Sequence, residues 1–226
     1  MTKKTTGKTK CEEAPLPGGL VLGEWRKTLR RNAFRGDATF DFVEVPEGVE
    51  RIGDDAFAEC PNLRSVVLPK SLRCLKNRVF CGCHQLESVQ IPEGVTEMWF
   101  CVFCECASLK EITFPNSLTV MGAATFSGCT ALRAVTLGTG LTSIPLDTFR
   151  GCTSLRSVVI PANVKSIGNG AFSGCSSLRS VVIEGECDIF PAAFTNCPAL
   201  KKVTIAGVVH HLEPGPTPLM GMFTAQ

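Results

Sequence analysis

The stretch SVVIPANVKSIGNGAFSGCSSL, residues 157–178, decides the fold, because variants of it recur along most of the chain. Its phenylalanine belongs to a series with six intervals of 23 residues and a last interval of 22. The series consists of Phe34, Phe57, Phe80, Phe103, Phe126, Phe149, Phe172 and Phe194. A fixed period of about 20–50 residues is the sequence signature of a stacked array. The sequence therefore predicts a solenoid in which each copy forms one coil.

Other residues keep a constant offset from the phenylalanine of each copy. Leucine recurs six residues after it, and apolar residues recur at nine and eleven residues, as in Val158 and Ile160. The alternation at nine and eleven is typical of one face of a short strand. Proline often follows, as at Pro161, and ends the strand because it has no N–H for the ladder.

The rest of each copy has apolar residues at threefold spacing, in a Val-x-x-Ile step and a Phe-x-x-Cys-x-x-Leu step. That spacing favours tight 3₁₀ or short helical turns. The predicted fold is therefore an α/β solenoid of about eight 23-residue coils. We expect a parallel sheet on one side of the coils and short turns or 3₁₀ segments on the other.

These columns resemble the BspA-like (type 5) leucine-rich repeat family, and residues 157–178 are close to its consensus. The resemblance covers roughly Leu20–Leu212. It departs at Asp37, which replaces the first column cysteine, and near Cys187, where one residue is missing. The resemblance implies a ligand-binding scaffold without shared catalytic residues. Many members of the family are surface proteins of bacteria and protists.

The pattern divides the chain into three segments. We expect a disordered N-terminal tail at residues 1–18 and a solenoid with terminal half-coils at residues 19–212. Residues 213–226 are expected to form a proline-rich C-terminal tail, because the repeat stops before Pro214, Pro216 and Pro218.

Most of the thirteen cysteines are explained by the repeat. Seven stand three residues after a phenylalanine and are expected to pack in the interior as small apolar residues: Cys60, Cys83, Cys106, Cys129, Cys152, Cys175 and Cys197. Three others, Cys81, Cys101 and Cys104, are expected to cluster on two neighbouring coils. They are candidate zinc ligands by residue type, but no clear fourth ligand accompanies them. A redox-active or partner-facing thiol patch and incidental, partly buried cysteines are the alternatives, and no cofactor is predicted.

A second column, seven residues after the phenylalanine, is basic in its last five members. We call it the basic column: Lys110, Arg133, Arg156, Arg179 and Lys201. One interpretation is a solvated face that discourages aggregation. The other is a docking stripe for an acidic segment of a protein partner, with Thr136 and Val159 beneath it. Nucleic acid is disfavoured, because no aromatic residue is interleaved with the stripe and the net charge is only +2.

No catalytic constellation is evident. The three histidines, His84, His210 and His211, have no partner that would orient them for nucleophilic catalysis. We therefore predict a non-enzymatic protein-binding scaffold. The chain shows no secretory signal, no membrane span and no Asn-x-Ser/Thr sequon. These absences favour an intracellular protein, cytoplasmic or cytoskeletal, that docks in a larger assembly. A surface-antigen or adhesion role is the alternative.

Overall fold

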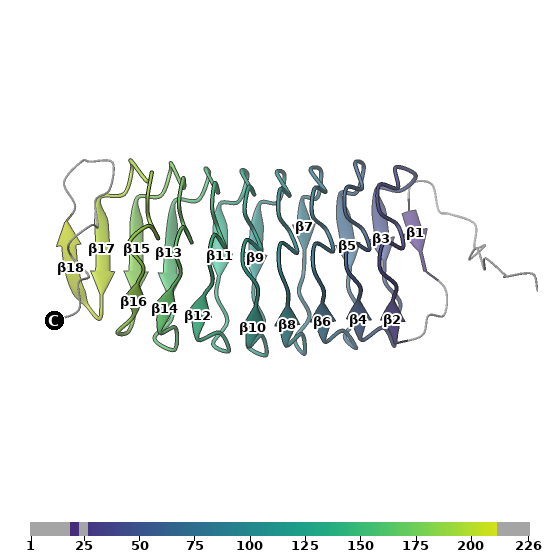
Figure 1. Cartoon of the computed structure of the whole chain (residues 1–226), viewed down its shortest axis with the longest axis horizontal. Helices are drawn as coiled ribbons and strands as arrows, with labels where there is room; N and C mark the ends of the chain where they lie inside the picture. Colours follow the sequence, from purple (N-terminus) through teal and green to yellow (C-terminus); the bar gives the residue numbers. More distant parts are fainter. Residues whose placement is uncertain (1–18, 23–26, 212–226) are drawn as a thin grey trace, which may run out of the picture.

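The computed structural model describes residues 19–22 and 27–211, which stack as successive coils into one elongated solenoid (Figure 1). The tails predicted at residues 1–18 and 213–226 lie outside the described residues. The proposed division into three segments therefore stays a prediction.

One side of every coil contributes a strand to a ladder that we call sheet I. Its members are β1 (Gly19–Val21), β3 (Phe42–Glu44), β5 (Ser65–Val67), β7 (Ser88–Val89), β9 (Glu111–Thr113), β11 (Ala134–Thr136), β13 (Ser157–Ile160), β15 (Ser180–Ile183) and β17 (Lys202–Ile205). Paired strands are parallel and one repeat apart, as Val158 with Val181. The predicted parallel sheet is thus confirmed. Strand pairing is interrupted between β7 and β9 and between β11 and β13.

The last strand of sheet I is covered by a hairpin. After β17 the chain turns at Ala206 and Gly207, both with positive φ, and β18 (Val208–His211) pairs antiparallel with β17. Two consecutive residues with positive φ make the turn type whose twist suits a two-residue hairpin.

A second parallel ladder, sheet II, occupies part of the region for which the sequence predicts only turns. Its members are β2 (Thr28–Leu29), β4 (Arg51–Ile52), β6 (Cys74–Leu75), β8 (Glu97–Met98), β10 (Val120–Met121), β12 (Ser143–Ile144), β14 (Ser166–Ile167) and β16 (Asp188–Ile189). These strands pair in parallel with their copies in neighbouring coils, as Ile52 with Leu75 and Ile144 with Ile167, except that pairing is interrupted between β10 and β12. The prediction of a sheet on one side alone is therefore wrong. Figure 1 shows the two ladders as two rows of arrows along the stack.

The Phe-x-x-Cys-x-x-Leu segment forms turns between the two sheets. In the Phe57 coil, the residues two before and two after the phenylalanine, Asp55 and Glu59, have φ of 54° and 60°. A left-handed residue on each side of the phenylalanine prevents a helical run. The backbone N–H groups bond instead to the next coil, as Phe57 to the carbonyl of Val79 at 2.9 Å. No helix of either kind occurs in residues 19–22 and 27–211, so the α/β class and the 3₁₀ segments are not confirmed.

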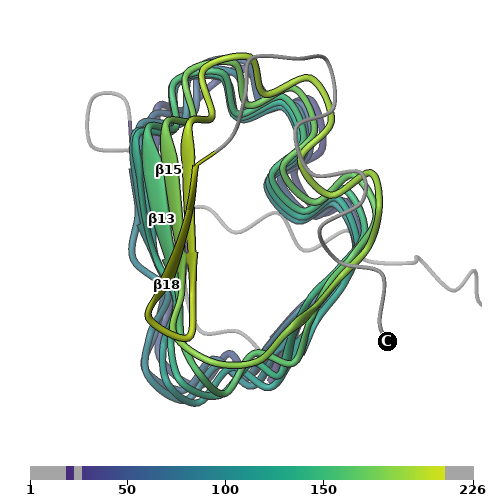
Figure 2. The same cartoon turned by 90° about the vertical axis from the view of Figure 1, so that its left-hand side faces the viewer.

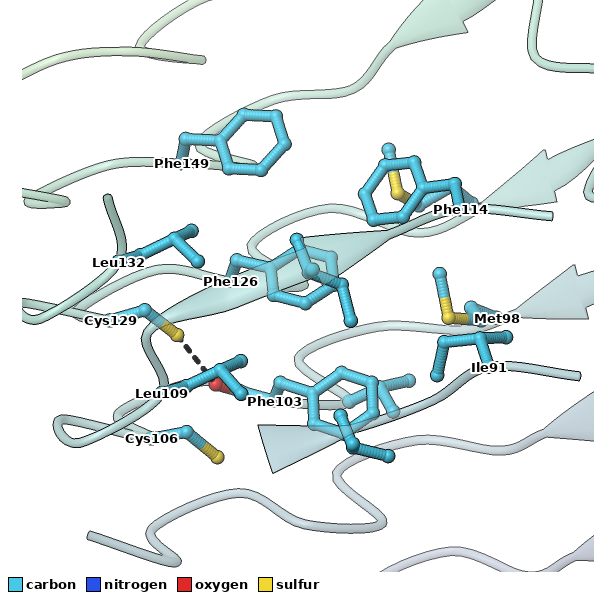
Figure 3. Close-up of a cluster of buried hydrophobic side chains, with 14 of the residues drawn as sticks. Ile91, Met98, Phe103, Cys106, Leu109, Phe114, Phe126, Cys129, Leu132 and Phe149 are labelled. Carbon is cyan, nitrogen blue, oxygen red and sulfur yellow. Dashed lines mark hydrogen bonds between the residues drawn. The ribbon is translucent and has the colours of Figure 1, made fainter. Parts of the chain in front are cut away.

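The phenylalanines form a continuous interior stack, as the sequence predicts. Neighbouring rings from Phe34 to Phe194 lie 5.2–5.7 Å apart between centroids and nearly parallel. Phe126 is fully buried, and its ring also contacts Phe114, 5.4 Å away. Figure 3 shows the middle of this stack, with the rings of Phe103, Phe114, Phe126 and Phe149 surrounded by side chains such as Leu109, Leu132 and Met98. The view along the stack in Figure 2 shows that the coils superpose around one shared interior.

The seven column cysteines are buried, which confirms the prediction, and they also have a polar role. Each thiol donates a hydrogen bond to the carbonyl of the phenylalanine in the preceding coil, at 3.0–3.3 Å. The dashed line in Figure 3 marks one of these bonds, from Cys129 to Phe103. A small residue that can donate a weak hydrogen bond therefore suits this column better than a purely apolar one.

The buried thiols make the fold sensitive to alkaline pH. Burial raises the pKa of Cys129 from an ordinary 9.0 to about 12, and that of Cys197 to about 11. Above pH 9 the unfolded chain loses thiol protons that the folded chain retains, so stability is present below pH 9 and falls as pH rises. One such thiol accounts for about 1.4 kcal/mol at pH 10.

We therefore expect the urea midpoint to fall between pH 8 and pH 10, and Cys129→Ala to reduce the accompanying loss of stability by about 1.4 kcal/mol. The exposed Thr130→Ala variant is the control and should show the wild-type loss. If Cys129→Ala loses as much stability between pH 8 and pH 10 as the wild type does, the burial of this thiol is contradicted.

Candidate binding surfaces

The outer face of sheet I carries the residues that the sequence analysis selects for partner binding. Thr136 lies exposed in β11, and the side chain of Val159 in β13 is 49% exposed. The inward neighbours Val158 and Ile160 are buried, because successive side chains of a strand point to opposite faces. This alternation places both predicted contact residues on the solvent side.

The basic column runs beside this face in register from coil to coil. The N–H of Arg133 donates to the carbonyl of Lys110 at 2.8 Å, and that of Arg179 donates to Arg156 at 2.8 Å. The N–H of Lys201 donates to the carbonyl of Arg179 at 3.1 Å. All five side chains are exposed.

Ion pairing divides this column into two parts. Glu87, which stands before Lys110 in the same column, lies 2.6 Å from the Lys110 ammonium and 3.6 Å from the guanidinium of Arg64. The Lys110 ammonium, by hydrogen bonding and charge, lowers the pKa of Glu87. Within the described part of the chain, Arg133, Arg156, Arg179 and Lys201 form no ion pair. The column therefore has a neutralised start and a positively charged end.

The first half of the sheet I face contains an open groove. It has a volume of about 700 Å³ and extends over β5 and β7. A smaller groove of about 370 Å³ lies where the pairing between β7 and β9 is interrupted. Glu93 and Glu111 line both grooves, whereas Lys70 lines only the larger one. The grooved first half of sheet I thus contains acidic residues, whereas the basic column beside the second half is positively charged.

Sequence reasoning missed a second exposed surface, on the corner that follows sheet II. An apolar groove of about 320 Å³ is formed there by Trp99, Phe100, Val120 and Leu146 with their neighbours. The ring of Trp99 is held by Lys76, whose ammonium lies 4.1 Å from the ring centroid, and its N–H donates to Glu97 at 3.1 Å. In most other coils the positions of Trp99 and Phe100 hold small or polar residues such as Gly53 and Asp54, although Leu146 and Phe190 also occupy these two columns. Aligning those two columns would have revealed the aromatic pair.

The three candidate metal ligands are brought together on the turn side of two adjacent coils. We call Cys81, Cys101 and Cys104 the thiol cluster, and all three are partly exposed. His84, the nearest histidine in sequence, is hydrogen-bonded through Nδ1 to the carbonyl of Glu105 at 2.9 Å. In residues 19–22 and 27–211 no group of three or more His, Cys, Asp or Glu side chains has the arrangement of a metal site. The geometry therefore gives the zinc interpretation no support.

The repeat architecture can now be compared with known families. A family model described as a BspA type leucine-rich repeat region, in 6 copies, matches residues 27–145 and 100–214. The chain belongs to the BspA-type leucine-rich repeat family. Leucine-rich repeat proteins generally bind protein partners, and their scaffold is generally non-enzymatic. A search of the curated proteins found no match.

Solved structures of other leucine-rich repeat proteins resemble this BspA-type chain. The Treponema protein, described as "T. pallidum Leucine Rich Repeat protein", is 28% identical with a TM-score of 0.65, and the match covers 71% of this chain and 78% of that one. A "leucine rich cell surface protein" of Faecalibacterium prausnitzii is 26% identical with a TM-score of 0.54, over 79% of this chain. This chain spans 63% of the length of that protein.

A Bacteroides ovatus leucine-rich repeat protein is 23% identical with a TM-score of 0.60, covers 87% of this chain and 66% of its own length, and shows the fold alone. The described residues contain no helix with the length and apolar character that a membrane crossing requires.

Proposed function

We propose that this leucine-rich repeat chain is a non-catalytic scaffold that docks an acidic segment of a protein partner on sheet I of its later coils. Arg133, Arg156 and Arg179 anchor the segment, and Thr136 and Val159 lie beneath it. The observation that carries the proposal is the row of exposed cations, in register and without ion pairs in the described residues, that ends the basic column.

Electrostatics supports this surface over a merely solvated one. Neighbouring cations about 5 Å apart repel each other by about 0.8 kcal/mol in water before salt screening. The first coils avoid this repulsion by placing Glu87 between Arg64 and Lys110. The later coils have no acidic residue in the column. An acidic segment lying across them would relieve the repulsion and bring carboxylates to bidentate guanidinium donors.

The dimensions fit an extended peptide. Successive coils lie about 4.8 Å apart, so the column from Arg133 to Lys201 spans about 14 Å. A few extended residues cover that length at about 3.3 Å each. The outer faces of β11 and β13, with exposed residues such as Thr136 and Val159, leave room for a strand or a loop.

The test is binding of a fluorescently labelled, glutamate-rich peptide by anisotropy at low and at physiological ionic strength. Reversal of Arg133, Arg156 and Arg179 to glutamate is expected to weaken binding by roughly 100-fold at low salt and to remove its salt dependence. The reason is that the three strongest anchors become repulsive.

The matched control reverses three exposed cations elsewhere, Arg30, Arg51 and Lys165, which changes the net charge by the same amount. This control should change affinity by less than about threefold. Equal losses in both triple variants would mean attraction by net charge alone, and unchanged affinity in the first would also overturn the proposal.

The setting we propose for this scaffold is an intracellular assembly, and its support is the set of buried thiols engaged as hydrogen-bond donors, as in a reducing compartment. A second candidate function is adhesion at the cell surface, favoured by the printed description of the Faecalibacterium relative. Protease treatment of intact source cells separates the two. Loss of the protein would establish the surface role, and protection until lysis would establish the intracellular one.

A further inference from the structure

The thiol cluster has a geometry that its metal-ligand interpretation does not explain. Cys101 and Cys104 bracket one turn, in which the N–H of Cys104 donates to the carbonyl of Cys101 at 3.1 Å. Val102 and Phe103 between them are fully buried, while both cysteines are partly exposed. The turn thus anchors its middle in the core and holds two thiols near the surface.

The third thiol comes from the preceding coil. Cys81 follows Phe80 as Cys104 follows Phe103, so the two residues occupy one column. The N–H of Gly82 donates to the carbonyl of Cys104 at 2.8 Å, which fixes the two coils in register at this point. Neighbouring coils are about 4.8 Å apart, within the Cα separation of about 4.4–6.8 Å that a disulfide requires.

The two stacked thiols differ in their protonation. The interaction with the neighbouring Cys104 thiol, together with the positive charge of Arg78, lowers the pKa of Cys81 to about 7. The same interaction, with burial, raises the pKa of Cys104, which keeps its proton. A thiolate and a thiol therefore stand side by side near neutral pH. The thiolate is the nucleophilic form of cysteine.

We propose that the thiol cluster is an oxidative modification site, at which a hydroperoxide converts Cys81 and Cys104 into a disulfide that joins the Phe80 and Phe103 coils. The inference is independent of the partner-binding role assigned to sheet I. Nothing in the repeat itself requires two partly exposed cysteines in one column at this place, where the neighbouring coils have Ala58 and Ser127.

The reaction balances in two steps. The Cys81 thiolate attacks one oxygen of hydrogen peroxide, the O–O bond breaks, and hydroxide leaves, so that Cys81 becomes a sulfenic acid. The Cys104 sulfur then attacks the Cys81 sulfur and displaces hydroxide, which takes up the thiol proton as water. Two thiols and one peroxide thus give one disulfide and two waters.

The interior cysteine column provides an internal comparison. Its members also stack one coil apart, but they are buried, and their thiols donate to phenylalanine carbonyls. Burial raises the pKa of Cys129 and of Cys152, so these thiols stay protonated and out of reach of solvent. Because all seven interior column cysteines are buried, oxidation should be selective for the partly exposed thiols of Cys81 and Cys104.

The test is peptide mapping after brief treatment of the folded full chain with stoichiometric hydrogen peroxide at neutral pH, followed by alkylation. Cleavage after lysine, arginine and glutamate separates fragment 79–87, with Cys81 and Cys83, from fragment 98–105, with Cys101 and Cys104. The expected product is a disulfide joining the two fragments through Cys81 and Cys104, with the interior cysteines alkylated only after unfolding.

Two variants sharpen the result. Cys104→Ser should leave a sulfenic acid on Cys81 that dimedone captures, and Cys81→Ser should slow oxidation of this region at least about tenfold. The proposal is overturned if the wild-type protein forms only a Cys101–Cys104 bond, or if Cys81 is no more reactive than Cys129. Because the wild-type map decides this by itself, a variant that fails to fold does not weaken the test.

Discussion

Replacing Phe126 by alanine is expected to lower the free energy of unfolding by about 3–5 kcal/mol, the usual cost of truncating a buried aromatic side chain. Phe126 is fully buried in the middle of the stack. Its ring lies 5.3 Å from Phe103 and 5.7 Å from Phe149, so its loss leaves a cavity bounded by two rings. The measurement is urea denaturation followed by circular dichroism, with thermal unfolding as a second probe.

The chain supplies a matched control in Phe100, which has the same side chain but is 51% exposed. Phe100→Ala should cost no more than about 1 kcal/mol, because most of its surface is already in water. A loss below about 1 kcal/mol for Phe126→Ala, equal to that of the control, would show that the phenylalanine column is not the core.

Gly138→Ala is expected to destabilise the fold by about 1–3 kcal/mol through a clash with the backbone of the preceding coil. A Cβ at this position would lie 2.8 Å from the carbonyl oxygen of Phe114 and closer still to that of Pro115. Backbone cannot move aside as a flexible side chain can. This loss of stability should appear even though Gly→Ala usually stabilises a protein by about 0.4–1 kcal/mol, because alanine lowers the conformational entropy of the unfolded chain.

The same column offers the control, because most coils have proline where this one has Gly138. Pro161→Ala, one coil later, keeps a Cβ that is already accommodated and should change stability by less than about 1 kcal/mol. Urea midpoints of the two variants compare them directly. A Gly138→Ala protein as stable as the wild type would mean that the coils are farther apart here than the structure places them.

The interior columns could be predicted from the sequence because the same burial constraint acts on each coil. A residue such as Cys129 or Leu132 meets its own copy above and below, so a deviation would open the core in two places. The strand at Val158 and Ile160 was likewise visible, since its alternation and the following proline are local signals.

Sheet II and the turns could not be read from local patterns. Each strand of sheet II has two residues, and its hydrogen bonds join residues one repeat apart. Threefold apolar spacing resembles a 3₁₀ pattern, but residues with left-handed backbone conformation, such as Glu59 and Cys101, exclude a 3₁₀ helix. A positive φ could not be predicted at these positions, because their residue types rarely adopt it. Hydrogen bonding between coils decides the conformation here instead, because buried backbone N–H and C=O groups must find partners.

The candidate site was also only partly accessible from sequence. The constant offset from the phenylalanine correctly predicted that the basic column is exposed. The ion pair that neutralises Lys110, however, depends on the side-chain conformation of Glu87, which the sequence does not determine. The apolar groove around Trp99 was missed because its residues do not repeat, and attention to repeating columns hides a feature confined to two or three coils.

The most direct test of the central claim, that a protein partner docks on sheet I of the later coils, is site-specific photo-crosslinking in the source cells. A photoreactive amino acid replaces Thr136 on sheet I or, in a second strain, Leu146 in the apolar groove. We expect a discrete protein adduct from position 136 that disappears when Arg133, Arg156 and Arg179 are reversed to glutamate. An adduct from position 146 with none from position 136 would contradict the claim.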